Sequence, residues 1–368
     1  MVKSRPIFRP AFGNRPDRIV GRDDVLAHLD SNLASYPGSK ERATLIMGQR
    51  GMGKTALLLE IADRASDAGY VVARITCGET MLDTLLDVLQ RDGGRYVKER
   101  KPPVQGFTAG ALGFSFGLTF TEEVAKAYGF RVKLEMLCDR LAEADKGVLI
   151  LIDEVEPSCA PLVELATTYQ ELVGEEKNIA VVMAGLPAAL SEVLNEKTLT
   201  FLNRADKIDL GPVSIASVRA YYASAFSRAG CIVSDVVLDK AARATSGFPY
   251  LLQLIGYYLV EYSSEGQEIT DDILNQACHA AFDELDSDVF LAMLRPLSRG
   301  DIEFLRAMAI DDGPTRVADL QTRLGVSQGH VQSYRRRLLD AGVVVSPRRG
   351  ELSFVIPRLR DYLREEEI

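Results

Sequence analysis

Short aliphatic runs recur along the first 210 residues, and segments with apolar residues at helical spacing separate them. Runs at 44–47, 71–75, 147–152 and 179–183 predict buried strands, and a fifth strand is expected at 207–210. Strands that are apolar at every position are buried on both faces, which is typical of a parallel sheet between layers of helices. The sequence therefore predicts an α/β fold whose parallel sheet has helices on both faces.

The hydrophobic pattern becomes almost entirely helical after residue 213 and changes again near residue 295. Four helices are expected in the first of these stretches, at 218–229, 235–244, 250–262 and 271–285. Together they predict a small helical bundle. Three helical segments and two short strands after residue 295 predict a winged helix-turn-helix. We therefore expect an α/β domain at 1–212, a helical domain at 213–294 and a winged helix domain at 295–368.

One insert interrupts the α/β pattern between residues 102 and 120. Its last part alternates aromatic or aliphatic residues with small or polar ones from Phe114 to Phe120, after a glycine-rich stretch. This period of two predicts an inserted β-hairpin. Two roles stay open for it, which are to cover the edge of the sheet or to protrude and contact DNA or a neighbouring subunit.

Composition narrows the class of protein without identifying it. Of 368 residues, 43 are Lys or Arg and 52 are Asp or Glu, which gives a formal net charge of −9. From Arg295 to the end there are 13 Arg, no Lys and 11 acidic residues, so this segment carries +2 and the first 294 residues carry −11. Such a chain is no general binder of nucleic acid or membranes, but its last part can hold a local basic patch.

Other features argue against secretion, membrane insertion and a metal cage. No uninterrupted apolar run approaches the roughly 18 residues that a membrane span needs, and the start of the chain has no apolar signal region. The five cysteines and three histidines are scattered and show no metal-ligand spacing. We therefore expect a cytoplasmic protein.

A phosphate-binding motif occupies the turn between the first strand and the next helix. Residues Gly48–Thr55 read GQRGMGKT and match the pattern G-x-x-x-x-G-K-[ST] in full. Glycines let backbone N–H groups approach a phosphate closely, and the following helix presents its N-terminus to the negative charge. Lys54 is expected to reach the β- and γ-phosphates, and the hydroxyl of Thr55 to ligate Mg²⁺. The nucleotide-binding residues expected here are Gly48, Gln49, Arg50, Gly51, Met52, Gly53, Lys54, Thr55 and Ala56.

Two acidic residues end the aliphatic strand VLILIDE at 148–154. The carboxyl end of such a strand is where ligands bind in parallel sheets. Asp153 is expected to hold Mg²⁺, usually through water, and Glu154 to polarise the attacking water as a general base. A strand of this kind is a moderate signal alone and a strong one after the phosphate-binding motif.

Four segments together resemble the AAA+ and STAND ATPases of the origin-recognition-like, archaeal-type branch. They are RIVGR at 18–22, GQRGMGKT, LILIDE, and SGFPYLLQ at 246–253. The resemblance covers roughly Arg18 to the end, and it implies ATP or ADP with Mg²⁺, a helical lid and a C-terminal winged helix. It also implies that Ile19, Val20, Gly21 and Arg22 border the adenine. The lid helix closing over the nucleotide is expected to begin at 247–250, where Pro249 and Tyr250 are the expected binding residues. By its residues alone, the segment 246–249 is equally a helix stop followed by a restart.

The chain departs from that family at the positions of its two sensors. The first sensor is often polar, but the fourth strand ends in Ala184, Gly185 and Leu186. The second is often an arginine after the lid glycine, where this chain has Pro249 and Tyr250. Fewer donors to the γ-phosphoryl group predict a slow ATPase that acts as a switch.

Arg204 is the candidate for supplying the missing positive charge. Its place before the fifth strand resembles the position from which related ATPases send an arginine finger into a neighbouring subunit. A finger requires a ring or filament of subunits. The alternative is a surface arginine paired with Asp206 or Asp209, and Arg50 can also contribute.

The second and third helices of the expected winged helix place polar and basic side chains together. Ser327 is expected to cap the third helix, whose N-terminal side chains can meet phosphates and base edges in a major groove. The wing carries basic side chains that can reach the DNA backbone or minor groove. The expected DNA-contacting residues are Gln328, His330, Gln332, Ser333, Arg336, Arg348 and Arg349. A protein-docking winged helix is the alternative.

These observations favour an ATP-dependent switch whose winged helix binds double-stranded DNA. A second hypothesis is a signalling or scaffold ATPase whose nucleotide state controls self-association and whose winged helix binds a protein. A third is a nucleotide-holding module with negligible turnover.

Overall fold

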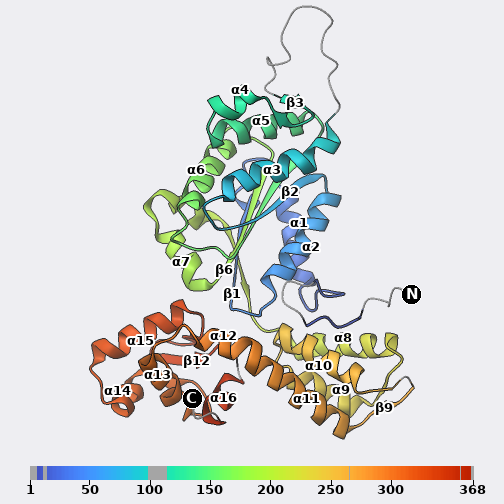
Figure 1. Ribbon diagram of the computed structural model, residues 1–368, viewed down its shortest axis with the longest axis vertical. Helices are drawn as coiled ribbons and strands as arrows, with labels where there is room; N and C mark the ends of the chain where they lie inside the picture. Colours follow the sequence, from blue (N-terminus) through green and yellow to red (C-terminus); the bar gives the residue numbers. More distant parts are fainter. Residues whose placement is uncertain (1–5, 11–14, 98–113, 265, 357, 366–368) are drawn as a thin grey trace, which may run out of the picture. The chain divides into compact units, whose positions relative to one another are not determined.

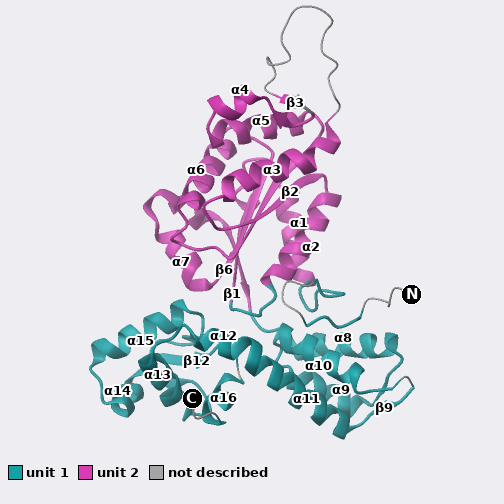
Figure 2. Ribbon diagram, viewed as in Figure 1, with its two compact units in different colours: residues 1–22, 49–53, 211–368 teal, residues 23–48, 54–210 magenta. Residues whose placement is uncertain are grey.

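The computed structural model describes residues 6–10, 15–97, 114–264, 266–356 and 358–365 (Figure 1). It divides into two compact units (Figure 2). The sheet unit contains residues 23–48 and 54–210, and the helical unit contains residues 1–22, 49–53 and 211–368. The three-domain division expected from the sequence stays a prediction.

A five-stranded sheet forms the centre of the sheet unit, with strand order β2-β5-β6-β1-β7. All its neighbouring strands pair in parallel, as predicted. The strands are β1 (Ala43–Gly48), β2 (Tyr70–Thr76), β5 (Gly147–Asp153), β6 (Ile179–Gly185) and β7 (Asp206–Leu210). They match the five expected runs to within a residue or two at each end.

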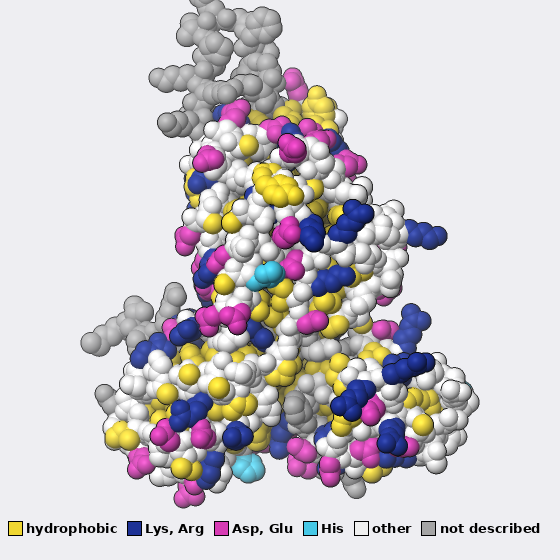
Figure 3. Space-filling model, turned by 180° about the vertical axis from the view of Figure 1, so that it is seen from behind, with side chains coloured by type: hydrophobic (Ala, Val, Ile, Leu, Met, Phe, Trp, Pro, Cys, Tyr) yellow, Lys and Arg dark blue, Asp and Glu magenta, His cyan; other side chains and the backbone are white. Residues whose placement is uncertain are grey.

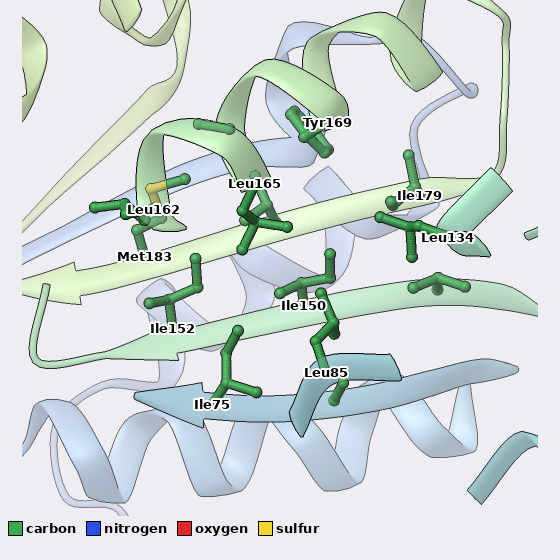
Figure 4. Close-up of a cluster of buried hydrophobic side chains, with 14 of the residues drawn as sticks. Ile75, Leu85, Leu134, Ile150, Ile152, Leu162, Leu165, Tyr169, Ile179 and Met183 are labelled. Carbon is green, nitrogen blue, oxygen red and sulfur yellow. The ribbon is translucent and has the colours of Figure 1, made fainter. Parts of the chain in front are cut away.

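Helices cover both faces of the sheet because its central strands are apolar on both sides. On one face, α3 (Met81–Gly93), α5 (Phe130–Ala142) and α6 (Ala160–Gly174) bury a core that includes Ile150 and Ile152 of β5 (Figure 4). Leu149 and Leu151 are outside that cluster but equally inaccessible to solvent, as expected for side chains on the opposite face. The helix α2 (Lys54–Asp67) packs against β2 and β5. The other described helices of this unit are α1 (Asp23–Ala34), α4 (Glu122–Ala127), α7 (Pro187–Asn195), η1 (Lys40–Arg42), η2 (Gly94–Tyr96) and η4 (Lys197–Arg204).

The predicted hairpin is seen only at its C-terminal end, because residues 102–113 lie outside the described residues. Strands β3 (Phe114–Phe116) and β4 (Thr119–Phe120) pair antiparallel, and the Phe114 and Phe120 rings stack 5.3 Å apart. Leu118 is buried in the core beside α3, and the Phe120 N–H donates to Gln90 of that helix. This end of the insert is therefore anchored on α3.

The middle of the helical unit is helical, with helices at the four positions that the pattern predicted. Its elements are α8 (Ile215–Arg228), α9 (Asp235–Ala244), α10 (Pro249–Glu261), α11 (Asp271–Leu285), η5 (Asp286–Phe290) and α12 (Leu291–Leu294). Two short strands missed by the sequence analysis, β8 (Ile232–Val233) and β9 (Glu268–Ile269), pair in parallel beside them. Among the described residues, none of the helices is long and apolar enough to cross a membrane.

The end of the chain combines helices with a small antiparallel sheet of order β10-β12-β11. In chain order the elements are α13 (Arg299–Ala309), β10 (Thr315–Arg316), α14 (Val317–Leu324), α15 (Gln328–Asp340), β11 (Val344–Val345), β12 (Glu351–Phe354) and α16 (Leu359–Glu365). The expected capping of α15 is confirmed, because the Ser327 side chain accepts the His330 N–H. Strand β10 and helix α16 were not predicted.

Candidate nucleotide site

The glycine-rich loop joins the end of β1, at Gly48, to the start of α2, at Lys54. Gly51 and Gly53 have φ angles of +76° and +83°, a left-handed conformation that glycine adopts without a Cβ clash. Arg50 is exposed at the turn, and Met52 is buried. Thr55 and Ala56 lie in the first turn of α2, where helix N–H groups lack intrahelical acceptors. The loop therefore has the backbone that a phosphate cradle requires.

The Lys54 ammonium lies beside the strand end from which the loop starts. Its Nζ donates a 2.8 Å hydrogen bond to the carbonyl oxygen of Gly48. Gly48 in turn pairs with Leu210 of β7, at the edge of the sheet. The ammonium is thus held over the carboxyl end of the central strands, where the phosphates of a nucleotide bind in parallel sheets.

Thr55 and Asp153 meet although they come from different elements. The Thr55 hydroxyl donates a 2.7 Å hydrogen bond to Oδ2 of Asp153, and the Glu154 N–H donates to Oδ1 at 3.0 Å. Asp153 is 6% exposed and is the last residue of β5, beside Thr76 of β2. A hydroxyl and one carboxylate at a strand end are the protein ligands that Mg²⁺ with a nucleotide commonly uses. These two residues fit a magnesium ion completed by phosphate oxygens and water.

Glu154 has an unusual backbone. Its φ is +52°, a left-handed conformation that costs a non-glycine residue free energy, and its side chain is exposed. The following residue, Val155, donates its N–H to the Ala184 carbonyl at 3.0 Å, which ties the turn to the end of β6. The kink turns the Glu154 side chain out of the sheet instead of continuing the strand. At the neighbouring strand end, Ala184, Gly185 and Leu186 offer no polar side chain.

The lid motif at 246–250 is a helix stop and restart that also touches the glycine-rich loop. Gly247 has φ +72°, and a Cβ there would lie 2.2 Å from the Val213 carbonyl oxygen. The Phe248 ring packs directly on the loop, since a Cβ on Gly51 would lie 2.2 Å from its Cζ. Pro249 starts α10, and its Cβ would lie 3.9 Å from a Cβ on Gly53. Phe248 was not among the expected site residues; its only sequence signal was its place between Gly247 and Pro249.

Tyr250, the other expected lid residue, is half-buried in α10. Burial, with smaller contributions from Glu284 and Asp288, raises the pKa of Tyr250 to about 12. The side chain therefore stays neutral at physiological pH. It can offer a hydroxyl and a ring face to a ligand, and no charge.

The segment Ile19–Arg22, expected to border the adenine, is held by the helical unit. A Cβ on Gly21 would lie 2.8 Å from Cγ1 of Val213, so only glycine fits this approach. The Arg22 guanidinium donates to the Gly211 carbonyl, and burial lowers the pKa of Arg22. Ile19 and Val20 are half-buried.

Arg204 ends η4 and is exposed. The alternative partner Asp206 is occupied, because its Oδ2 accepts 2.8 Å hydrogen bonds from His28 and Asn32. Within the described part of the chain, Arg204 forms no ion pair with Asp206 or Asp209. Its guanidinium therefore projects into solvent from the sheet unit.

The expected DNA-contacting side chains are exposed on α15 and on the turn between β11 and β12. Some are already engaged locally: the His330 ring lies 2.8 Å from the Ser327 hydroxyl, and Ser333 donates to the Gly329 carbonyl. Arg336, Arg348 and Arg349 remain exposed, with Arg336 3.8 Å from Asp340. On the face drawn in Figure 3, basic side chains are interspersed with acidic ones and form no continuous basic surface.

Comparisons with known proteins agree with this geometry. Residues 18–182 match the family described as AAA ATPase domain, and residues 287–363 match a family described as a domain of unknown function (DUF8462). No curated protein matches the sequence significantly.

Solved structures match the fold over nearly the whole chain. The Walker-type ATPase PABY2304 of Pyrococcus abyssi superposes with a TM-score of 0.71 at 15% identity, covering 98% of each chain. The Aeropyrum pernix ORC2 protein, in ADPNP and ADP complexes, superposes with a TM-score of 0.65 at 16% identity, covering 97% of this chain and 95% of that one. At this level of identity the likeness shows a shared fold.

Proposed function

We propose that this AAA+ ATPase of the origin-recognition-like type hydrolyses Mg²⁺-ATP slowly and uses its nucleotide state to control DNA binding by residues 295–368. The observation that carries the proposal is the hydrogen bond of 2.7 Å between Thr55 and Asp153. It joins the end of the phosphate-binding motif to the acidic strand end, and these are the two residues that would hold a magnesium ion, Asp153 usually through water. The ion would neutralise charge on the phosphates when bound.

Phosphate binding and proton transfer are assigned to two side chains of this protein. Lys54 binds the β- and γ-phosphates, and Glu154 accepts a proton from the attacking water as general base. The absence of a polar side chain at 184–186 removes one donor for charge that develops on the γ-phosphoryl group. Slow turnover follows, unless Arg204 of a second copy supplies the charge in an assembly.

We assign residues 295–368 to a winged helix-turn-helix. The order α13, β10, α14, α15, β11, β12 supports this assignment, because a winged helix has a recognition helix followed by a two-stranded wing. In this arrangement α15 enters the major groove, and Arg348 and Arg349 on the wing reach the backbone.

Two measurements on the full chain test the nucleotide part. Wild-type protein should bind ATP with magnesium present and release phosphate, whereas Lys54→Ala should lose binding. Glu154→Gln should bind ATP and lose hydrolysis, because glutamine keeps the shape of the side chain and cannot take the proton. ATP binding without hydrolysis by the wild type would leave a nucleotide-holding module.

A protein-docking role for the C-terminal part is the second candidate, and specific contacts favour it. Arg323, Arg337 and Arg364 are bound to Asp311, Asp301 and Asp312, so their charges are already neutralised inside the unit. DNA binding and protein docking are distinguished by comparing the duplex affinity of the wild type with that of a variant in which Arg336, Arg348 and Arg349 are all replaced by alanine. Loss of salt-sensitive affinity supports DNA binding, and the absence of such affinity in the wild type supports a protein partner.

A further inference from the structure

The N-terminal arm, residues 6–10 and 15–18, is packed on helices that follow it by more than 190 residues in sequence. Its Phe8 side chain is 2% exposed, although the segment has no regular secondary structure. The ring lies 5.7 to 5.8 Å from the rings of Tyr221, Tyr222 and Phe226 of α8. Edge-on and tilted contacts at these distances are the preferred geometry of aromatic pairs. Phe8 is thus the anchor of the arm.

On the side away from α8, the Phe8 ring packs against α10 at a glycine, Gly256. A Cβ on Gly256 would lie 2.2 Å from Cε1 of Phe8, well inside van der Waals contact. Gly256 is a helical residue at which glycine is unfavourable for the backbone. Glycine at this position therefore makes room for Phe8.

Further contacts fix the arm on both sides of the anchor. The Arg9 N–H donates a 2.9 Å hydrogen bond to Oε1 of Gln253 on α10. Nearer the start of α1, Asp17 forms a 2.7 Å ion pair with Arg228 at the end of α8. The arm is thereby attached to both α8 and α10.

The attached arm leads directly into the segment Ile19–Arg22. Gly21 lies against the Val213 side chain, and Val213 also donates its N–H to the Gly247 carbonyl at 2.8 Å. One residue therefore contacts both the segment expected to border the adenine and the lid motif. The arm restricts the same segment from its other end.

We propose that the N-terminal arm, anchored by Phe8 beside Gly256, is a positioning element that holds Ile19–Arg22 in the conformation that receives the adenine base. This inference rests on the proposed nucleotide function of the same site. Phe8 does not itself touch the nucleotide. Its loss removes a restraint on the segment at the base end of the ligand and leaves the phosphate-binding loop unchanged.

Binding of ATP and of inorganic triphosphate, measured by calorimetry on the full chain with magnesium, tests this inference. In Phe8→Ala, ATP affinity should fall about tenfold, equivalent to 1.4 kcal/mol, while triphosphate affinity stays unchanged. Phe8→Leu should retain most of the ATP affinity, because leucine still fills the pocket. Gly256→Ala should act like Phe8→Ala by excluding the ring, while its helix propensity improves.

The double variant Phe8→Ala/Gly256→Ala should be no worse than Phe8→Ala, because the two changes act on one contact. Gly174→Ala, at the end of α6 with open space around a new Cβ, is the matched control and should bind both ligands as the wild type does. Unchanged ATP affinity in both Phe8→Ala and Gly256→Ala overturns the inference. A parallel loss of ATP and triphosphate affinity also overturns it, since the arm would then support the whole unit. A wild type that binds triphosphate and ATP equally removes the base-positioning role while keeping the phosphate site, and one that binds neither refutes the proposed function itself.

Discussion

The hydroxyl of Thr55 donates a 2.7 Å hydrogen bond to Oδ2 of Asp153, a residue 98 positions later in the sequence. The two side chains come from the first turn of α2 and the end of β5. Because Asp153 is nearly buried and its other oxygen accepts the Glu154 N–H, its carboxylate is held in one orientation. The two side chains that would hold magnesium are therefore already oriented toward one site, so little rearrangement of the protein would be needed.

Thr55→Val should therefore weaken ATP binding only when magnesium is present. Valine keeps the shape of threonine but supplies no oxygen ligand, so the affinity for Mg²⁺-ATP should fall by at least about tenfold. Thr55→Ser keeps the hydroxyl and is the control. Titration calorimetry with magnesium and with a chelator checks both variants; an equal loss in the two conditions would contradict a role as metal ligand.

Two substitutions of Glu154 can test its side chain and its left-handed backbone separately. Glu154→Gly should abolish ATP hydrolysis and also raise the free energy of unfolding by about 0.5–1 kcal/mol, because glycine relieves the φ of +52°. Glu154→Gln should abolish hydrolysis with no gain in stability. Phosphate release and thermal unfolding measure the two effects.

Glu176 provides the matched control for that prediction. It has φ +58° in an exposed turn after α6 and no part in the proposed site. Glu176→Gly should therefore raise stability by a similar amount and leave hydrolysis unchanged. A stability gain at 176 with none at 154 would mean that the Glu154 side chain makes compensating contacts.

Local sequence patterns predicted the strands and most helices because burial and periodicity are local signals. The run at 147–152 is apolar throughout and alternates with helical patterns, which predicted a strand buried on both faces, and GQRGMGKT predicted the loop that follows β1. Strands β8, β9 and β10 were not predicted, because two residues show no period of their own. Strand β11 is equally short but lies within the longer run expected as a strand at 342–346. Helix α16 was not predicted, because its seven residues make only about two turns and show no clear helical period.

The sequence did not predict contacts between residues that are far apart along the chain. Phe8 stands in a Pro- and Arg-rich segment, and nothing near it indicates that Gly256 makes room for its ring. Phe248 was not predicted as a site residue for the same reason, because Gly51, which its ring contacts, lies far from it in the sequence. Such pairs depend on tertiary packing, which no single-sequence periodicity encodes.

The contact between Gly51 and Phe248 predicts a steric conflict that Gly53 does not share. Both glycines have positive φ. A Cβ on Gly51 would lie 2.2 Å from the Phe248 ring, whereas a Cβ on Gly53 would lie 3.9 Å from its nearest neighbour, Cβ of Pro249. Gly51→Ala should therefore lower the free energy of unfolding by about 1–3 kcal/mol more than Gly53→Ala. Thermal unfolding of the full chain measures the difference.

Phe248→Leu should remove most of that difference, because the smaller side chain makes room for a methyl group on residue 51. The comparison is between Gly51→Ala and Gly53→Ala, each made in the Phe248→Leu background. An undiminished difference in that background would show that the cost at Gly51 comes from its backbone alone.

The ion pair between Asp301 and Arg337 predicts an acid-sensitive C-terminal part. Burial acts to raise the pKa of Asp301, but hydrogen bonds from Arg337 and Ser298 outweigh it, so the pKa lies below its usual value. The carboxylate therefore stabilises the folded state fully above the unfolded pKa of about 4, and this stabilisation is lost as the pH falls through the folded pKa. Asp301→Asn should cost about 1–2 kcal/mol near pH 7, a range that allows for the half-exposed Arg337.

The cost should vanish at low pH, because protonation removes the same charge from the wild type. Scanning calorimetry of the full chain from about pH 7 to about pH 3 should show the two melting curves converging. Asp311→Asn is the control: the Asp311 side chain is 28% exposed against 4% for Asp301, so the loss of its charge should cost less than about 1 kcal/mol. A difference between wild type and Asp301→Asn that persists at the lowest pH would assign the effect to the shape of the capping hydrogen bonds at Ser298 and not to the charge.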